Sequence, residues 1–206
     1  PKPGSQEQRP LGIPTVRDRV AQAAVLQEIE PIFESCFADN SYGFRPGRGA
    51  KDALQVVDSL LQTGYVHVVD ADIKAYFDTL PHEPLLKLVR MEIHDERVIR
   101  LIQTFLEAGV MEGKALLYLP EEGTPQGGVI SPLLANIYLD PLDHLMVRQG
   151  YGLIRYADDF LVQCRSHKEA DNALAMVQEW MASAGLALHP TKTKIVDVSQ
   201  PGEGFE

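Results

Sequence analysis

Three aspartates are the residues in this sequence best suited to chemistry. Asp72 follows a valine-rich segment that predicts a buried strand over 65–71, and Asp158 and Asp159 stand side by side at the tip of a predicted hairpin. Carboxylates at the ends of neighbouring strands would form an all-oxygen site for a hard divalent cation such as Mg²⁺. Two such ions, about 3.5–4 Å apart, can stabilise both the attacking and the leaving oxygen in phosphoryl transfer.

Simpler interpretations exist for the same aspartates. An aspartate after a strand usually caps the next turn, and an acidic hairpin tip can be a solvated turn. A two-residue hairpin turn prefers residues such as Asn-Gly that accept a positive φ, whereas Ala157-Asp158-Asp159 places two like charges together. Each acidic position taken singly leaves both interpretations open, and their occurrence together favours the metal site.

The elements that position these aspartates are a mixture of helices and strands. Helical periodicity and capping signals predict helices over 15–34, 50–63, 82–93, 95–108 and 167–184 and a long helix from Ser131. Strands are predicted over 65–71, 114–119, 151–156, 160–164 and 194–198, and the Gly- and Pro-rich segments 41–49 and 123–128 are predicted loops. This order indicates an α+β fold, in which an antiparallel sheet carries helices on one face.

Length and composition limit the class of protein. The 206 residues are 45% hydrophobic and 23% charged, which is typical of one globular unit or two small lobes. The sequence has no run of 18 apolar residues, and the polar segment 1–9 lacks the apolar region of a secretory signal. Cys36 and Cys164 cannot form a disulfide framework or a Cys/His metal cluster. We therefore expect a protein in the reducing cytoplasm without a membrane partner.

The net charge argues against a strong grip on nucleic acid. Nineteen Lys and Arg residues against 29 Asp and Glu residues give a formal charge of −10. Because proteins bind nucleic acid largely by neutralising phosphates, an acidic chain needs either a local basic surface or basic regions elsewhere in a longer protein.

Six blocks of sequence, taken in order, carry a family resemblance. The blocks are Arg9–Arg19, Ser41–Arg48, Asp70–Asp78, Gly123–Pro132, Tyr156–Asp159 and Gly185–Lys194. They resemble the fingers and palm of a bacterial reverse transcriptase of the group II intron-encoded (maturase) type, over nearly the whole chain. The resemblance implies a right-hand polymerase palm with partial fingers and no thumb. It implies one reverse transcriptase domain over 11–206, with a flexible lead-in over 1–10, a fingers part over 11–64 and a palm with fingers insertions over 65–206.

The resemblance also implies roles for single residues. Asp72, Asp158 and Asp159 would be catalytic and, with the Ile73 carbonyl, would hold two Mg²⁺ ions, or Mn²⁺ in their place. Phe77 would exclude a 2′-hydroxyl beneath the sugar. Lys192 would approach the leaving pyrophosphate. The remaining nucleotide contacts would come from Arg45, Lys74, Ala75, Tyr76, Gln126 and Gly127, and nucleic-acid contacts from Arg17, Arg19 and Arg48.

Most of these residues also have ordinary structural interpretations. Phe77 could instead be part of the hydrophobic core. Gln126 could stabilise only its own turn, and Lys192 could be a solvated cap after Pro190. Arg45 and Arg48 are also suited to being surface charges on a loop.

The resemblance implies an RNA-directed DNA polymerase core that adds dNMP to a primer 3′-hydroxyl. Its partners would be an RNA template with a DNA or RNA primer, dNTPs, the cognate intron RNA, and the thumb and maturase domain of a longer chain. One alternative is a non-catalytic, maturase-like RNA-binding scaffold, which has no need of three unneutralised carboxylates. Another is a metal-dependent nuclease, which would not use the Gln126 loop or an aromatic at position 77. Relatives in diversity-generating, retron or CRISPR-linked systems share these blocks.

Overall fold

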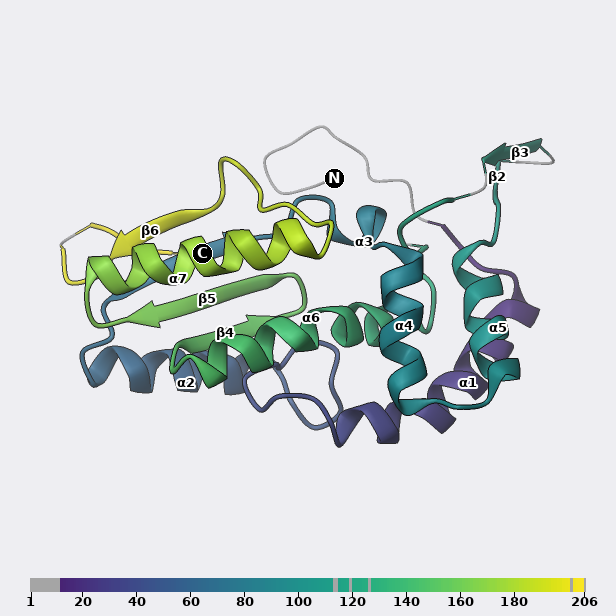
Figure 1. Ribbon diagram of the computed structural model, residues 1–206, viewed down its shortest axis with the longest axis horizontal. Coiled ribbons are helices and arrows are strands. Elements are labelled where there is room, and N and C mark those ends of the chain that lie inside the picture. The colour runs from purple at the N-terminus through teal and green to yellow at the C-terminus, as the bar shows by residue number, and fades with distance from the viewer. Residues whose placement is uncertain (1–11, 113–114, 119, 126, 201, 206) are drawn as a thin grey trace.

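A four-stranded antiparallel sheet forms the centre of the fold (Figure 1). The computed structural model describes residues 12–112, 115–118, 120–125, 127–200 and 202–205. In the sheet order β4-β5-β1-β6, the strands are β4 (Gly152–Tyr156), β5 (Asp159–Cys164), β1 (His67–Asp72) and β6 (Lys194–Asp197). A separate ribbon pairs β2 (Val110–Glu112) with β3 (Ala115–Tyr118). The α+β class predicted from the sequence is confirmed.

Helices form where periodicity and caps predict them. They are α1 (Val16–Glu34), α2 (Ala50–Gln62), α3 (Tyr76–Thr79), α4 (His82–Glu92), α5 (Glu96–Leu106), α6 (Ser131–Arg148) and α7 (His167–Ser183). At the start of α1, the Thr15 hydroxyl oxygen accepts a hydrogen bond from the Asp18 N–H at 3.2 Å. At the end of α7, Gly185 has a φ of +68°, the left-handed conformation that stops a helix. Within the described residues, none of the helices is long and apolar enough to cross a membrane.

The sequence analysis missed two short elements and misplaced some strand ends. α3 spans only four residues and follows the left-handed Ala75, so it has no periodicity to detect. β2 pairs with β3 through an irregular register, which weakens the alternation that would predict it. β1 begins two residues later than predicted and includes Asp72, and Asp159 belongs to β5 rather than to the hairpin tip.

The two faces of the sheet are covered differently. Side chains such as Val69, Val162 and Leu153 lie in the main core, packed beneath α6 and α7 (Figure 1). On the opposite face, α2 packs over Ile154 of β4 and leaves the end of the sheet near Asp159 uncovered by any described helix. The expectation of helices on one face therefore holds for α6 and α7, and α2 is a partial cover on the other.

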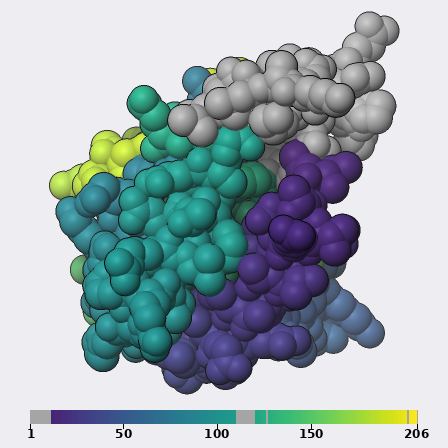
Figure 2. Space-filling view, turned by 90° about the vertical axis from the view of Figure 1, so that its right-hand side faces the viewer, coloured from purple at the N-terminus to yellow at the C-terminus, as the bar shows by residue number. Residues whose placement is uncertain are grey.

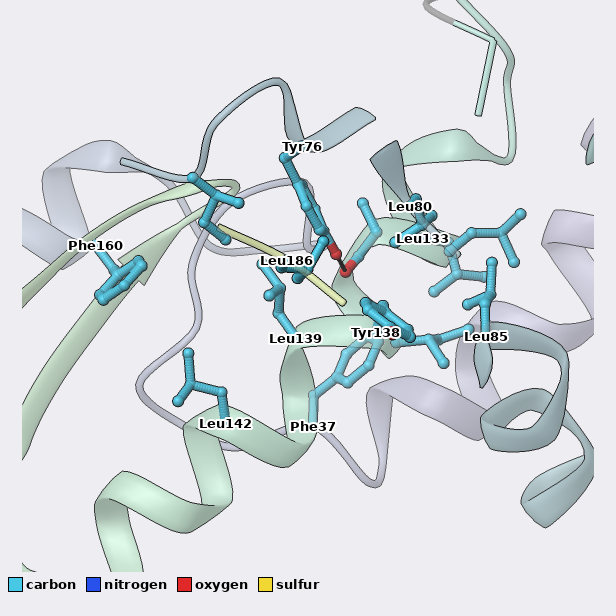
Figure 3. Packing of buried hydrophobic residues seen from close by; sticks show 14 of the residues in the cluster. Phe37, Tyr76, Leu80, Leu85, Leu133, Tyr138, Leu139, Leu142, Phe160 and Leu186 are labelled. Carbon is cyan, nitrogen blue, oxygen red and sulfur yellow. Dashed lines mark hydrogen bonds between the residues drawn. The ribbon is translucent and has the colours of Figure 1, made fainter. Parts of the chain in front are cut away.

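The main core continues past the sheet into a group of helices. α4 packs on α5 and α6, and α1 packs on α5 and α6. Figure 2 shows this end of the molecule, with α1 beside α4 and α5. Figure 3 shows Tyr76, Leu139 and Leu186 within this core. Because α6 contacts both the sheet and these helices, it is the element against which most others are fixed.

Candidate active site

Asp72 and Asp159 face one another across the central strand pair. The antiparallel register of β1 and β5 places them directly opposite each other, with Tyr156 beside Asp159 on β4. Asp158 lies in the turn that joins β4 to β5, one residue before Asp159. The three aspartates predicted to act together are therefore brought to one end of the sheet, with Asp72 and Asp159 on the face opposite α6 and α7.

This end of the sheet holds unfavourable negative charge. Like charges directly opposite in a ladder repel each other. Desolvation raises the pKa of Asp159 above its ordinary value of 3.8, and the charges of Asp158 and Asp70 raise it further. Two lysines from the segment after α7 offset this charge, because Lys192 pairs with Asp72 and the Lys194 ammonium lies 3.8 Å from the Asp70 carboxylate.

The donor set fits a hard cation, although the carboxylates do not yet converge on one point. Within the part of the chain that the structure describes, no group of three or more His, Cys, Asp or Glu side chains is arranged to hold a metal ion. The Lys192 ammonium takes the place beside Asp72 that a cation would need. Carboxylate oxygens are the ligands that Mg²⁺ prefers, so the residues suit this metal once Lys192 leaves Asp72.

The backbone after Asp72 is tied to the rest of the fold. The Lys74 N–H donates to the Ala187 carbonyl at 2.8 Å, so this amide is not available to a triphosphate. Ala75 has a φ of +48° and starts α3, and the Tyr76 side chain is buried with its hydroxyl donating to the Ala135 carbonyl at 2.6 Å. Ile73 is buried and bridges to Leu188. The backbone of 75–77 and the exposed side chain of Lys74 remain suited to the predicted contact with nucleotide.

Phe77 is half-buried at the edge of the site and contacts an aromatic residue that the sequence analysis missed. Its ring lies edge-on to the Phe44 ring, with centroids 6.4 Å apart and planes at 81°. Phe44 is 51% exposed and has a φ of +58°, which is unusual for a bulky side chain. Its sequence signal was weak, because a phenylalanine within a Gly- and Pro-rich loop resembles any exposed loop residue.

The loop before α6 lies next to Phe77. The Thr124 N–H donates to the Phe77 carbonyl at 2.6 Å, which joins the loop to the segment after β1. A Cβ added at Gly123 would lie 2.6 Å from the Asp78 carbonyl oxygen, so only glycine fits there. Gly127 is exposed beside this contact. Gln126, predicted to touch the nucleotide, lies outside the described residues.

Arg45 has a structural role that corrects the prediction of phosphate contact. Its side chain is 2% exposed and its guanidinium pairs with Glu34 at 2.7 Å. The same group donates to the Ala38 and Ser41 carbonyls at 2.6 and 2.9 Å. Because its described partners already engage each nitrogen, Arg45 anchors the loop 41–48 and does not reach solvent.

The other predicted arginines remain at the surface. Arg48 pairs with Asp39 at 2.8 Å, and this guanidinium lowers the pKa of the Asp39 carboxyl. Arg17 and Arg19 are exposed on the first turn of α1. All three are therefore accessible, although Arg48 already has a carboxylate partner.

A cavity of about 520 Å³ opens between α2 and the uncovered sheet face, and its lining includes Asp159 of the three candidate aspartates, together with Asp70. Its walls combine apolar side chains of α2 and the sheet with charged groups of the site. They include Ala53, Leu54, Val57, Asp70, Ile154, Tyr156, Asp159, Leu161, Lys192 and Lys194. The carboxylates therefore border a hollow that could admit part of a substrate.

α6 holds the segments that surround the site by polar contacts as well as by packing. These contacts reach one residue in each of three predicted blocks, and Arg155, which directly precedes a fourth. Asn136 Nδ2 donates to the Gly43 carbonyl at 2.8 Å, and Ser131 Oγ donates to the Pro125 carbonyl at 3.1 Å. The Tyr76 hydroxyl donates to the Ala135 carbonyl of α6 at 2.6 Å. The Arg155 guanidinium, next to the Tyr156 block, donates to the Asp143 carboxylate at 2.6 Å. One helix thus sets the relative positions of the blocks.

Comparison with known proteins supports the resemblance seen in the blocks. The chain matches the family described as reverse transcriptase (RNA-dependent DNA polymerase) over residues 1–202. It is 44% identical to Protein YkfC of Escherichia coli (strain K12), over 96% of this chain and 61% of that protein. It is 42% identical to the group II intron-encoded protein LtrA of Lactococcus lactis subsp. cremoris, over 71% of this chain and 24% of that protein. The chain thus spans less than two thirds of the length of either relative.

Solved structures share the fold at low sequence identity. Apo telomerase from Candida tropicalis matches with a TM-score of 0.65 at 12% identity, covering 94% of this chain and 37% of that one. Telomerase from Candida albicans with a fragment of telomeric RNA matches with a TM-score of 0.60 at 14% identity, covering 89% and 34%. The family match, the relatives and the shared fold lead to one conclusion: the chain belongs to the reverse transcriptase (RNA-dependent DNA polymerase) family, among the proteins that group II introns encode.

Proposed function

We propose that this chain is the catalytic core of an RNA-directed DNA polymerase that adds dNMP to a primer 3′-hydroxyl. The observation that carries the proposal is the register of β1 and β5, which sets Asp72 opposite Asp159 with Asp158 in the adjoining turn. The excess charge there, expressed in the raised pKa of Asp159, supports the binding of a multivalent cation. The cavity beside the aspartates leaves room for substrate.

Asp72, Asp158 and Asp159, with the Ile73 carbonyl, would hold two Mg²⁺ ions, or Mn²⁺ in their place. Such ions supply charge neutralisation at the attacking and leaving oxygens of phosphoryl transfer. The side chains contribute mainly by positioning, because phosphoryl transfer needs little covalent chemistry from the protein. Lys192 would exchange its pairing with Asp72 for contact with the departing pyrophosphate.

The remaining contacts would select and orient the substrates. Phe77 would lie beneath the deoxyribose and exclude a 2′-hydroxyl, and the backbone at 75–77 with the loop at Gln126 and Gly127 would line the nucleotide. Arg17, Arg19 and Arg48 would contact the template or primer backbone.

The partners and the domain arrangement follow from the same proposal. The chain would copy an RNA template from a DNA or RNA primer with dNTPs, and it would recognise its intron RNA in the bacterial cytoplasm. Residues 11–64 would be part of the fingers and 65–206 the palm with fingers insertions. A thumb and maturase region of a longer protein would complete the binding surface and supply basic charge that this chain, at −10, lacks.

Primer extension tests the proposal directly. The chain, with and without a supplied thumb region, is incubated with an RNA template, a labelled primer, dNTPs and Mg²⁺. We expect extension that EDTA abolishes and that Asp158→Asn removes. The absence of extension from the complete enzyme would overturn the proposal.

A non-catalytic RNA scaffold is the second candidate. It is favoured by the pairing of Lys192 with Asp72, since a carboxylate held by an internal ammonium has no need of a metal. The two candidates differ in one measurement. If the chain is a scaffold, the wild type and Asp158→Asn would bind intron RNA with equal affinity, and neither would extend a primer.

A further inference from the structure

A buried arginine joins the strand before the aspartate turn to α6. Arg155 of β4 and Asp143 of α6 have side chains that are 1% and 0% exposed. Arg155 Nε donates to Asp143 Oδ1 at 2.9 Å and Nη2 to Oδ2 at 2.6 Å, while Nη1 donates to Asn136 Oδ1 at 2.8 Å. We name Arg155, Asp143 and Asn136 the Arg155 network. None of these residues has a role in the chemistry derived above.

The Arg155 network also holds the turn itself. Arg155 Nη1 donates to the Ala157 carbonyl at 2.9 Å, and Ala157 is the residue immediately before Asp158. Ala157 has a φ of +60°, in the left-handed region that non-glycine residues occupy only where the surroundings impose it. The guanidinium therefore fixes the peptide that sets the direction of Asp158.

The same network reaches the loop that carries Phe44. Asn136 Nδ2 donates to the Gly43 carbonyl at 2.8 Å. A Cβ added at Gly43 would lie 2.2 Å from the Ala157 nitrogen, so the loop is pressed against the turn. The backbone of Arg155 reinforces this contact, because its N–H donates to the Asn40 carbonyl and its carbonyl accepts from the Tyr42 N–H, both at 2.9 Å.

The chemistry of this network suits positioning more than stability. A buried ion pair often stabilises a fold no more than well-packed apolar side chains do, because desolvation opposes the attraction. Its advantage is geometric. The planar guanidinium donates to Asp143, Asn136 and Ala157 at once, which a lysine ammonium on a flexible stem cannot reproduce.

We propose that Arg155 is a positioning residue for Asp158, acting through the Ala157 carbonyl and held in place by Asp143 and Asn136. The proposal rests on the function proposed above. It predicts that loss of the guanidinium loosens the turn and weakens cation binding, while the rest of the fold persists.

Two variants test the network in different ways. Arg155→Lys keeps the charge and removes the fork, and the double variant Arg155→Met with Asp143→Leu replaces the ion pair by apolar side chains that can pack. Tyr138→Phe is the matched control, because Tyr138 also lies on α6 and is buried, and its hydroxyl donates to the Ala184 carbonyl at 2.6 Å and not to the Arg155 network. Melting temperature and circular dichroism report whether each variant is folded.

The first readout needs no metal and no activity. Amide hydrogen exchange is followed in a peptide that covers 156–160 in the metal-free chain. The second readout is Mn²⁺ affinity, measured from the signal of free Mn²⁺ in electron paramagnetic resonance. We expect both Arg155 variants to exchange faster in this peptide and to bind Mn²⁺ about tenfold more weakly or worse, as outer partners of metal ligands commonly do. Tyr138→Phe should change neither.

The outcomes separate this proposal from the proposed function. Unchanged exchange over 156–160 in the folded double variant would overturn the role of Arg155, even if the wild type extends primers. An equal effect of Tyr138→Phe would overturn it too, since the loss of any polar contact of α6 would then suffice. A wild type that binds Mn²⁺ but never extends a primer would overturn the polymerase function, and faster exchange in the Arg155 variants would still support positioning.

Discussion

Asp72 and Asp159 are directly opposed residues of the β1–β5 ladder, and both side chains lie on the face of the sheet that α6 and α7 do not cover. A like-charged pair at this spacing weakens a sheet. The Lys192 ammonium at Asp72 reduces the repulsion in the metal-free chain. The arrangement therefore favours any cation that can replace the lysine and contact both carboxylates.

Removal of one carboxylate should abolish catalysis while sparing the fold. Asp158→Asn keeps the shape of the side chain and removes a charge that a divalent cation needs. We expect a loss of primer extension on the order of 10³-fold, about 4 kcal/mol of transition-state stabilisation. Asp58→Asn, an exposed change on α2, is the control and should extend primers normally. Near-normal extension by Asp158→Asn would exclude this aspartate from the metal site.

The stability of the metal-free chain should depend on pH through Asp159. Desolvation and the neighbouring charges of Asp158 and Asp70 raise its folded pKa above the ordinary 3.8. Because the folded pKa is raised, the contribution of Asp159 to the free energy of unfolding is fully present below pH 3.8, where the carboxyl is protonated in both the folded and the unfolded state. This contribution is lost as the pH rises through the folded pKa.

Urea denaturation of wild type and Asp159→Asn across a pH series measures this effect. The two proteins should be similar below pH 3.8, and the variant should become the more stable one as the pH rises above the folded pKa of Asp159. If the difference in free energy of unfolding between the two proteins stays constant with pH, the folded pKa of Asp159 is not raised. Added Mg²⁺ should stabilise only the wild type at neutral pH.

Phe44 should share in sugar selection with Phe77, because their rings are in edge contact. Phe77→Val should raise the use of rNTPs relative to dNTPs, and Phe44→Ala should raise it to a smaller extent by leaving the Phe77 ring without its neighbour. Steady-state incorporation of matched rNTP and dNTP pairs measures both. If neither ratio moves, the two rings are only part of the packing.

Arg45 should affect stability and not nucleotide binding. Arg45→Met leaves Glu34 without this partner and removes the short bonds to the Ala38 and Ser41 carbonyls, at a cost of about 2–4 kcal/mol. Among the described residues, these carbonyls keep only longer bonds, from the Ser41 N–H at 3.4 Å and from Arg48 Nη1 at 3.5 Å. Chemical denaturation measures the loss, and the KM for dNTP of the complete enzyme should remain within about threefold of wild type, since a factor of three is under 1 kcal/mol. A large rise in KM at unchanged stability would restore the phosphate contact first expected of this residue.

Binding to primer–template should be weak and only moderately dependent on salt. Arg17, Arg19 and Lys74 are exposed and Arg48 is partly exposed, so we expect two to four phosphate contacts and a slope of log affinity against log salt of about −2 to −4. Fluorescence anisotropy across a salt series measures the slope. A steep slope with nanomolar affinity would show that this acidic chain carries the whole binding surface.

Local sequence determined most elements and indicated the family of the protein. Helix α1 could be predicted from the Thr15 cap and α7 from its Gly185 stop, because both signals act within a few residues. The order of the blocks around Asp72 and Asp158 indicated the family. Short-range preferences of this kind are encoded by neighbouring residues and need no knowledge of the rest of the chain.

Tertiary structure alone decided which of those residues meet. Asp72 and Asp159 oppose each other only because two strands 87 positions apart pair in one register. Arg45 was predicted to contact phosphate, but its three side-chain nitrogens make five hydrogen bonds within residues 34–45. Arg155 is an ordinary strand residue in the sequence, and only the packing of α6 places Asp143 against it. Such contacts depend on how distant elements pack and which charges become desolvated together, and no local pattern of residue types carries that information.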